Sequence, residues 1–345
     1  MPYHGLFCTA NAGGFALEWR PLGGLPRPSA HEVLVQVRAA SVNPIDTKRA
    51  AGYGARLLRL KGATGMPRVL GNDFAGVVAD VGSGVREFAV GQRVWGVLDT
   101  GAVGTHASHV VVPTNQLFFA PHSVPDAVLA ALPYNFCTMW RALRDAGIEE
   151  HGAKGRRILV HGASGGLGLL ALQILRGWGA ITTAVCSTPA IEQCFAAGAS
   201  EVYDRTSQTL HDLEAVYDAV LNFANWTDER VLATKLNARA LGMASTTHPL
   251  LASLDQYGWL RGAWRIVRAQ REVRQLVRQC SPTAVYRWTV FRPDAQALLA
   301  LNGLLRTDTI DLPIGISCPV TDAQAAFVHV AQQKRGRAIL TFNTH

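Results

Sequence analysis

The feature that most restricts the fold is a glycine-rich turn that follows an apolar run. Residues 158–168 read Ile-Leu-Val-His-Gly-Ala-Ser-Gly-Gly-Leu-Gly. The apolar residues predict a buried strand, and Leu167–Gly177 predicts an amphipathic helix directly after the turn. A turn that joins a strand to a helix leaves the first N–H groups of the helix open to an anion. The segment therefore predicts an anion-binding turn in an α/β protein.

Each glycine of this turn has a separate role in holding a dinucleotide. Gly162 allows the chain to turn sharply, and Gly168 lets the helix pack close to the sheet, while the glycines between them let the backbone approach a pyrophosphate. A turn without a ligand is the alternative, but the strand before it and the helix after it favour cofactor binding. The expected cofactor contacts are Gly162, Ser164, Gly165, Gly166, Leu167 and Gly168.

The chain around this turn alternates strands with helices. Repeated strand–helix units predict a doubly wound parallel sheet with helices on both faces, which is the Rossmann architecture. We assign residues 126–291 to this domain, with Tyr286–Phe291 as its edge strand. The other strands are expected at Ile158–His161, Ile181–Cys186, Val202–Tyr203, Ala219–Phe223 and Ala240–Ser245.

The first 125 residues have a different pattern. Short strands separated by glycines, with little helix, predict a small antiparallel barrel over residues 1–125. The final segment, residues 292–345, is too short for a domain, so we expect it to fold back onto this barrel. The predicted strands are residues 33–40, Val77–Val81, Arg93–Val97, Ser108–Val112, Leu312–Ser317 and Arg337–Phe342.

The residues after the second and third parallel strands bear on the choice of cofactor. An NAD site usually has an acidic residue after the second strand to hold the ribose hydroxyls. This chain has Ser187 and Thr188 there, which favours NADP(H). Arg205, after the next strand, could pair with the 2′-phosphate, with an ordinary surface arginine as the alternative. Thr246, and Thr247 beside it, are further expected neighbours of the cofactor.

Several motifs then occur in a characteristic order. They are Ala40–Asp46, Gly71–Gly76, Gly91–Trp95, Leu132–Pro133 with Thr138, and Gly162–Gly168. In this order they resemble the quinone oxidoreductase branch of the medium-chain dehydrogenase/reductase superfamily. Ser41–Asp46 with Gly52–Gly54, and Ala184–Ser187, are most similar to the reticulon-interacting oxidoreductases within that branch. The resemblance implies a GroES-like catalytic barrel beside the Rossmann domain, a homodimer, and contact of Thr138 with the nicotinamide ribose.

The resemblance also implies a site without metal. Zinc-dependent relatives have Cys where Asn43 stands and His where Asn72 stands, and two carboxamides cannot replace these ligands. The six cysteines form no C-x-x-C pair, so we expect neither a structural zinc site nor disulfides. Without a Lewis acid, acceptors that delocalise the incoming charge are favoured, which are quinones and α,β-unsaturated carbonyls.

Three residues are the expected catalytic group. Asn43 would orient the nicotinamide amide or the substrate oxygen, Tyr53 would donate to the developing anion, and Asp46 would hold the loop. The alternatives are that Asn43 only shapes a turn and that Tyr53 only packs. Tyr134 is expected to line the pocket.

Two departures from the family pattern affect this assignment. Lys48 stands where related reductases often have tyrosine, and Phe223-Ala224-Asn225 replaces glycines that usually approach the cofactor. The bulkier residues predict a substrate choice that differs from that of the relatives.

The formal net charge is +8, and most of the positive charge is arginine. One helical block contains six arginines at intervals of three or four, which form a basic stripe. A solvated face is the expected reading, and a membrane surface or partner is the alternative. The arginines are Arg261, Arg265, Arg268, Arg271, Arg274 and Arg278, and the apolar contacts of the helix are expected from Trp259, Trp264, Val267, Val273 and Val277.

The sequence also leads to expectations about the cellular location and the partners of the protein. We find no apolar stretch long enough to span a membrane, and residues 1–5 show no secretory pattern, so we expect a cytoplasmic protein. The sequence contains no basic motif with interleaved aromatic residues, so we expect no specific nucleic-acid binding.

These observations predict an NADPH-dependent oxidoreductase that passes hydride to a quinone or another conjugated carbonyl. The alternatives are an enone or enoyl-thioester C=C reductase and a non-catalytic NADPH-binding interaction protein.

Overall fold

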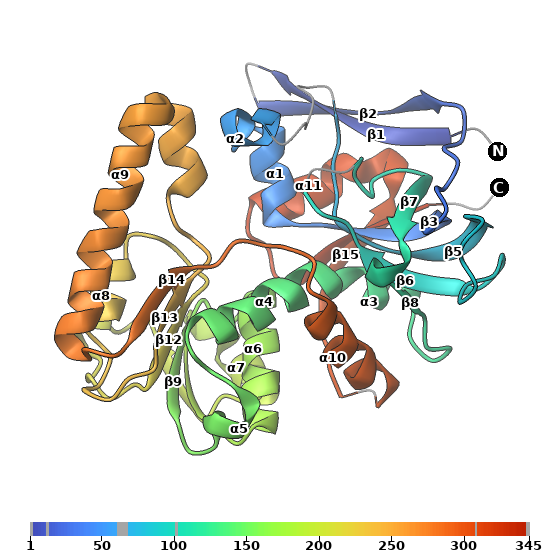
Figure 1. The fold of residues 1–345 in the computed structure, drawn as a ribbon. Helices are drawn as coiled ribbons and strands as arrows, with labels where there is room; N and C mark the ends of the chain where they lie inside the picture. The colour runs from blue at the N-terminus through green and yellow to red at the C-terminus, as the bar shows by residue number, and fades with distance from the viewer. Residues whose placement is uncertain (1–2, 12–13, 61–67, 101–102, 308, 343–345) are drawn as a thin grey trace. The chain divides into compact units, whose positions relative to one another are not determined.

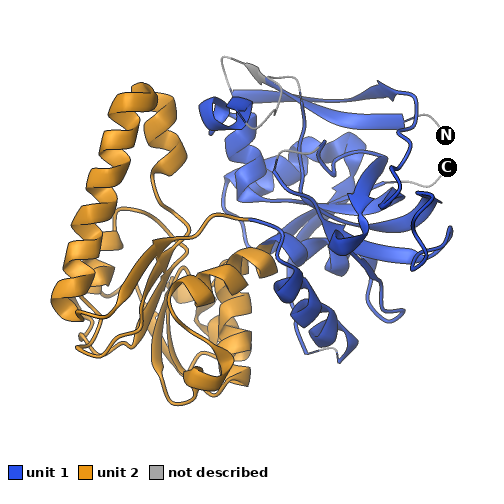
Figure 2. Ribbon diagram, viewed as in Figure 1, with its two compact units in different colours: residues 1–134, 292–345 blue, residues 135–291 orange. Residues whose placement is uncertain are grey.

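The computed structural model describes residues 3–11, 14–60, 68–100, 103–307 and 309–342. The chain divides into two compact units, which Figure 2 shows in different colours. Unit 1 contains residues 1–134 and 292–345, and unit 2 contains residues 135–291. Unit 1 has two sheets and unit 2 has one, and each unit has its own buried apolar core.

Unit 1 is built around a seven-stranded sheet in which β3 is the central element. The strand order is β15-β16-β3-β5-β6-β8, and β7 also pairs with β3. Alternate residues of β3, among them Val33, Val35 and Val37, are buried because the sheet packs against a second, three-stranded sheet and helices. The strands are β3 (Glu32–Val42), β5 (Asp73–Val81), β6 (Arg93–Val97), β7 (His109–Pro113), β8 (Leu117–Phe119), β15 (Ile314–Pro319) and β16 (Arg337–Thr341).

The predicted return of the C-terminal segment is confirmed. Strand β16 pairs antiparallel with β3 and parallel with β15, so the sheet is mixed rather than antiparallel throughout. The sequence analysis missed the second sheet, of order β2-β1-β4. Its strands are β1 (Tyr3–Asn11), β2 (Gly14–Gly23) and β4 (Arg68–Val69), and the helices of unit 1 are α1 (Pro44–Ala50), α2 (Ala55–Leu60), α3 (Asp126–Ala131), α10 (Ala295–Arg306) and α11 (Ala323–Ala331).

Unit 2 is a six-stranded parallel sheet of order β11-β10-β9-β12-β13-β14. Helices α6 and α7 cover one face, and α8 and α9 cover the other (Figure 1). This order is that of a Rossmann domain, in which the chain reverses direction across the sheet between the first and fourth strands, here β9 and β12. The strands are β9 (Arg157–His161), β10 (Ile181–Cys186), β11 (Glu201–Asp204), β12 (Ala219–Asn222), β13 (Gly242–Ser245) and β14 (Val285–Trp288).

The helices of unit 2 confirm the alternating pattern that the sequence predicts. Among the described residues they are α4 (Pro133–Asp145, which begins in unit 1), α5 (Glu150–Ala153), α6 (Gly166–Gly177), α7 (Ile191–Ala197), α8 (Glu229–Ala233) and α9 (Leu250–Cys280). The one long element, α9, breaks at Gly258, whose φ of +74° is not helical.

The boundary between the units lies at Tyr134 rather than at residue 125. The intervening helix α3 packs on β3 and β5, and its Asp126 pairs with Arg93 of β6 at 2.5 Å. A helix held by unit 1 therefore precedes the boundary, which local composition did not reveal. In the described part of the chain, no helix combines the length and the apolar character needed to cross a bilayer.

Candidate functional site

The glycine-rich turn of unit 2 has the geometry that its sequence predicts. Gly162 follows β9 with φ of +80°, and the N–H groups of Gly162 and Ala163 both donate to the Val185 carbonyl at 3.2 Å. A Cβ on Gly168 would lie 2.5 Å from backbone atoms of Ala163 and Gly162, so the helix packs directly on the turn. The turn is thus rigid on its inner side.

The outer side of the same turn is open. Gly165 is exposed at the start of α6, and Ser164, Gly166 and Leu167 are half-buried. A Cβ on Gly165 would meet only the Gly162 carbonyl, at 3.4 Å. The first N–H groups of α6 therefore face outward in a position suited to a pyrophosphate, because helix N-termini favour anions.

Parallel pairing brings the other predicted cofactor residues to the same edge of the sheet. His161 is in register with Asn222 on one side and Val185 on the other, and Asn222 is in register with Ser245. The residues after these strands, including Ser187 and Thr246, consequently follow the same carboxyl edge, where ligands of such sheets bind. Thr246 donates its N–H to the Asn222 carbonyl at 3.0 Å.

The region after β10 contains a carboxylate that the sequence analysis did not place there. Asp204, the last residue of β11, accepts a hydrogen bond from the Thr188 hydroxyl at 2.6 Å. The hydroxyl of Thr188 and the N–H of Thr206 lower the pKa of Asp204, so this group is anionic at neutral pH. Arg205 is exposed beside it. No acidic residue follows β10 itself, as the sequence analysis states, but the pairing of β10 with β11 brings the Asp204 carboxylate next to Thr188.

The segment Phe223-Ala224-Asn225 is held against the glycine turn. A Cβ on Gly162 would meet the Ala224 nitrogen at 3.0 Å, which is tighter than an ordinary contact, so the two loops lie close together. The Asn222 side chain accepts from the Ala224 N–H at 3.1 Å and donates to the Asn225 carbonyl at 2.7 Å. The bulkier segment thus forms a fixed wall beside the turn.

A buried polar network supports this wall, and the sequence analysis missed it. Asn222 donates to Glu229 at 2.5 Å, and the Tyr286 hydroxyl donates to the other oxygen of Glu229 at 2.8 Å. Glu229 is fully buried, and burial raises the pKa of its carboxyl. His161 contacts Asp228 at 2.9 Å, although burial lowers the pKa of that imidazole. In the sequence, the one feature that indicated this network was the polar residue Asn222 at the end of an apolar strand.

Unit 1 contains a second buried polar cluster, centred on Asn43. This residue precedes α1, and its N–H donates to Asp46 at 2.8 Å. The other Asp46 oxygen accepts from the Gly71 N–H at 3.1 Å, which confirms Asp46 as the residue that holds the loop. The Asn43 side chain donates to Ser41 at 2.9 Å and to Asp73 at 3.1 Å.

Arg337, from the far end of the chain, completes the cluster. Its guanidinium donates to the Asn43 side-chain oxygen at 2.5 Å. Asp73 accepts from the Ser41 hydroxyl at 2.6 Å and from the Tyr134 N–H at 2.6 Å. Burial raises the pKa of Asp73 to about 7, although these donors and Arg337 act in the opposite direction. Asn43 is fully buried with its amide engaged, so contact with a ligand stays a prediction.

The second carboxamide that replaces a zinc ligand is also engaged. Asn72 donates to the Leu98 carbonyl at 2.9 Å, and its own oxygen is buried with no hydrogen-bond partner in the described part of the protein. The described residues contain no group of three His, Cys, Asp or Glu side chains that could hold a metal ion.

Comparison with known proteins decides the family. Residues 29–122 match the alcohol dehydrogenase GroES-like domain. The chain is 31% identical over 330 residues to the mitochondrial NAD(P)H oxidoreductase RTN4IP1 of Mus musculus, covering 90% of this chain and 81% of that protein. It is 34% identical over 228 residues to the chloroplast envelope quinone oxidoreductase homolog of Arabidopsis thaliana, covering 64% and 68%.

The chain belongs to the quinone oxidoreductase-like branch of the medium-chain dehydrogenase/reductase superfamily. Its fold is also that of the quinone oxidoreductase from Coxiella burnetii, with a TM-score of 0.80 at 20% identity, covering 99% of this chain and all of that one. The predicted class, a GroES-like domain with a Rossmann domain, is therefore confirmed.

Within this oxidoreductase fold, three predicted site residues lie in the following places. Tyr53 occupies the turn after α1, with the Lys48 ammonium 5.8 Å from the centre of its ring. Tyr134 is half-buried at the start of α4, and burial raises the pKa of its phenol. Thr138 is buried one turn further along α4. Their contacts with substrate or cofactor stay predictions.

Proposed function

We propose that this oxidoreductase transfers hydride from NADPH to a quinone or another conjugated carbonyl acceptor without a metal ion. The observation that carries the proposal is the open turn at Gly162–Gly168, at the point where the parallel sheet reverses its strand order. Membership of the family supports an oxidoreductase that uses a nicotinamide cofactor.

Unit 2 supplies the residues that would hold the cofactor. The N–H groups at the start of α6 would bind the pyrophosphate, because Gly165 leaves their approach clear. Arg205 would pair with a 2′-phosphate, and Asp204, whose carboxylate is bonded to Thr188, opposes that charge. The proposal of NADPH over NADH therefore depends on Arg205. When bound, the reduced nicotinamide supplies the hydride.

Unit 1 supplies fixed polar groups for the acceptor. Asn43 is oriented by Ser41, Asp73 and Arg337 together, so its amide cannot rotate freely. The buried guanidinium next to it provides positive charge where a zinc-dependent relative has a cation, and it opposes binding of a second cation. Tyr53 remains the proposed donor to an enolate or hydroquinone oxygen.

The absence of a Lewis acid in this proposal determines the acceptor. A plain ketone localises the incoming charge on one oxygen, whereas a quinone or enone spreads it over a conjugated system. The alternative on the same scaffold is reduction of the C=C bond of an enone or enoyl thioester. Both reactions need the same fixed groups.

Steady-state oxidation of NADPH with a panel of quinones, enones and saturated ketones tests the proposal. We expect turnover with conjugated acceptors only, and turnover restricted to enones would select the alternative. Tight NADPH binding without turnover of any acceptor would support a non-catalytic interaction protein. Stoichiometric zinc in the purified protein, or rapid oxidation of aliphatic alcohols, would contradict the proposal.

We also propose a homodimer and a cytoplasmic location. Strand β14 is an edge of the six-stranded sheet, so its outer side is free to pair with a second copy, as the family resemblance implies. Sedimentation velocity would detect the homodimer. Cytoplasmic residence stays a prediction, which cell fractionation would test.

A further inference from the structure

The long helix α9 carries an exposed apolar surface that the cofactor site does not explain. Its second part packs back on its first part. The approach is close, since a Cβ on Gly262 would lie 2.7 Å from the Ser253 carbonyl oxygen. Val273 and Val277 are buried, as predicted. Trp259, Trp264 and Val267 were expected to pack but are exposed, because they lie on the outer side of this helical hairpin.

The exposed residues form two parallel stripes along the helix. Leu260, Trp264 and Val267 are spaced at i, i+4 and i+7, so they share one face. Leu260 is 89% exposed and Trp264 is 60% exposed. The second stripe, Arg261, Arg265 and Arg268, has the same spacing and begins one residue later. We call the two stripes together the α9 surface.

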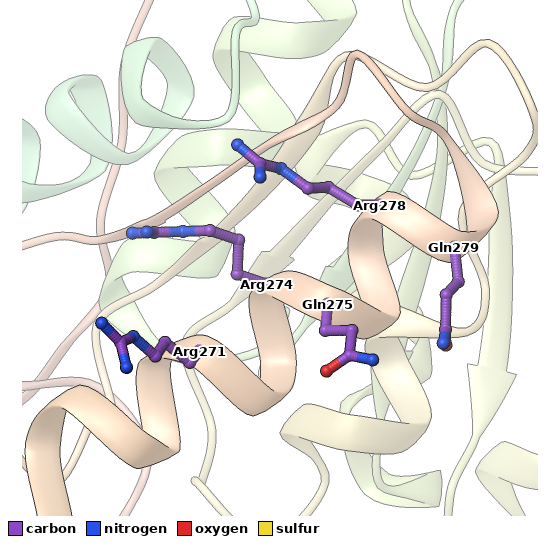
Figure 3. Close-up of a pocket in the computed structure, with 5 residues that line it drawn as sticks. All are labelled: Arg271, Arg274, Gln275, Arg278 and Gln279. Atoms are coloured by element: carbon purple, nitrogen blue, oxygen red, sulfur yellow. The ribbon is translucent and has the colours of Figure 1, made fainter.

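The charge of the α9 surface is nearly unopposed. Residues 256–271 contain four arginines and no carboxylate. Glu272 pairs with Arg268 at 2.8 Å and also with Arg230. Within the described ranges, neither Arg261 nor Arg271 has an ion-pair partner. The basic character continues toward the end of the helix, where Figure 3 shows Arg271, Arg274 and Arg278 extending from the same side of α9.

Aromatic contacts hold two of these cations beside the apolar stripe. The Arg268 guanidinium lies 5.4 Å from the centre of the Trp264 ring, and the Arg265 guanidinium lies 4.2 Å from that of Tyr257. Indole rings prefer the boundary between apolar and aqueous phases, and guanidinium groups bind phosphates with two donors. The α9 surface thus has the chemistry of an interfacial helix at an anionic bilayer.

We propose that the α9 surface binds the surface of an anionic phospholipid membrane, with Leu260, Trp264 and Val267 in the headgroup boundary and the arginines on the phosphates. A second copy of the chain is a poorer occupant. A two-fold contact would place like-charged arginine rows together without carboxylates between them. Trp264 is the one aromatic ring of the apolar stripe, whereas binding of single-stranded nucleic acid uses several aromatic rings for successive bases.

Cosedimentation of the full chain with lipid vesicles tests this proposal. We expect binding to vesicles of phosphatidylcholine with phosphatidylglycerol, little binding to phosphatidylcholine alone, and release at high salt. Arg261→Gln, Arg265→Gln and Arg268→Gln together should weaken binding by about 100-fold, since each basic residue contributes about fivefold. Leu260→Ser with Trp264→Ser should weaken it by at least about tenfold.

The matched control lies on α10, which also presents an exposed leucine and arginine. Leu299→Ala with Arg306→Gln should leave vesicle binding unchanged. All variants should keep the wild-type melting temperature and the wild-type turnover of a water-soluble acceptor. Failure of the membrane-binding proposal can therefore be distinguished from failure of the proposed oxidoreductase function. Equal binding by wild type and both α9 variants, or no binding to anionic vesicles, would overturn the proposal. The proposal would also be overturned if the wild-type protein formed an oligomer that the Leu260→Ser, Trp264→Ser variant did not form.

Discussion

Gly165, which precedes α6, and Gly168 and Gly177 within α6 allow the cofactor turn to be tested against a control in the same helix. Gly168→Ala places a methyl group 2.5 Å from the Ala163 Cα, the Ala163 oxygen and the Gly162 oxygen. Carbon atoms pack at about 3.5–4.0 Å, so α6 must move outward by roughly 1 Å. Overpacking of this kind costs about 1–3 kcal/mol. Because the shift moves the N–H groups that would bind pyrophosphate, NADPH affinity should fall at least about tenfold.

Gly165→Ala and Gly177→Ala separate affinity from stability. A Cβ on Gly165 has only one neighbour, at 3.4 Å, so the unfolding free energy should fall by less than about 1 kcal/mol. Its methyl group would nevertheless stand in the open approach to α6, and NADPH affinity should fall about tenfold. Gly177, at the other end of the helix, has no neighbour within 4 Å. Gly177→Ala should raise the free energy of unfolding by about 0.4–1 kcal/mol and leave the affinity for NADPH unchanged.

Thermal unfolding and nicotinamide fluorescence titration measure the two quantities on the same samples. Gly168→Ala should lower the melting temperature by roughly 2–4 °C for each kcal/mol lost. Unchanged stability and unchanged affinity in Gly168→Ala would refute the close-packing argument. Normal affinity in Gly165→Ala, with normal stability, would show that the cofactor does not approach this helix.

Two further predictions concern charge. Arg205→Ala should weaken NADPH binding by about tenfold and leave NADH binding unchanged, whereas Asp204→Asn should tighten NADPH binding. Fluorescence titration measures both effects. Equal loss of affinity for NADPH and NADH in Arg205→Ala would remove Arg205 from the site. The pKa of Asp73 is raised to about 7 from an ordinary value near 3.8. The folded state therefore holds this proton more tightly, so the group's contribution to stability is complete below about pH 4 and is lost as the pH rises through about 7. Asp73→Asn should remove this pH slope in chemical unfolding between pH 4 and 8, and an unchanged slope would assign it to other groups.

The sequence alone determined the elements and the architecture of unit 2. Strand β10 was predicted with its observed bounds, and the strand before the glycine turn and the helix after it were each placed to within one residue. Such features are local, because apolar periodicity selects the element and Gly162 permits a backbone angle that other residues rarely adopt. The family motifs supplied the class of the first domain, although β1 and β2 were missed.

The tertiary structure decided which distant side chains meet. Arg337 and Asn43 are 294 positions apart, and they come together because β16 pairs with β3. Asp204 reaches Thr188 through the pairing of β10 with β11, a contact that the positions of the two residues in the sequence do not show. The exposure of Trp264 likewise follows from how α9 folds back on itself. Spacing along a chain fixes the face of an element on which a residue lies, but the pairing of elements fixes what that face touches.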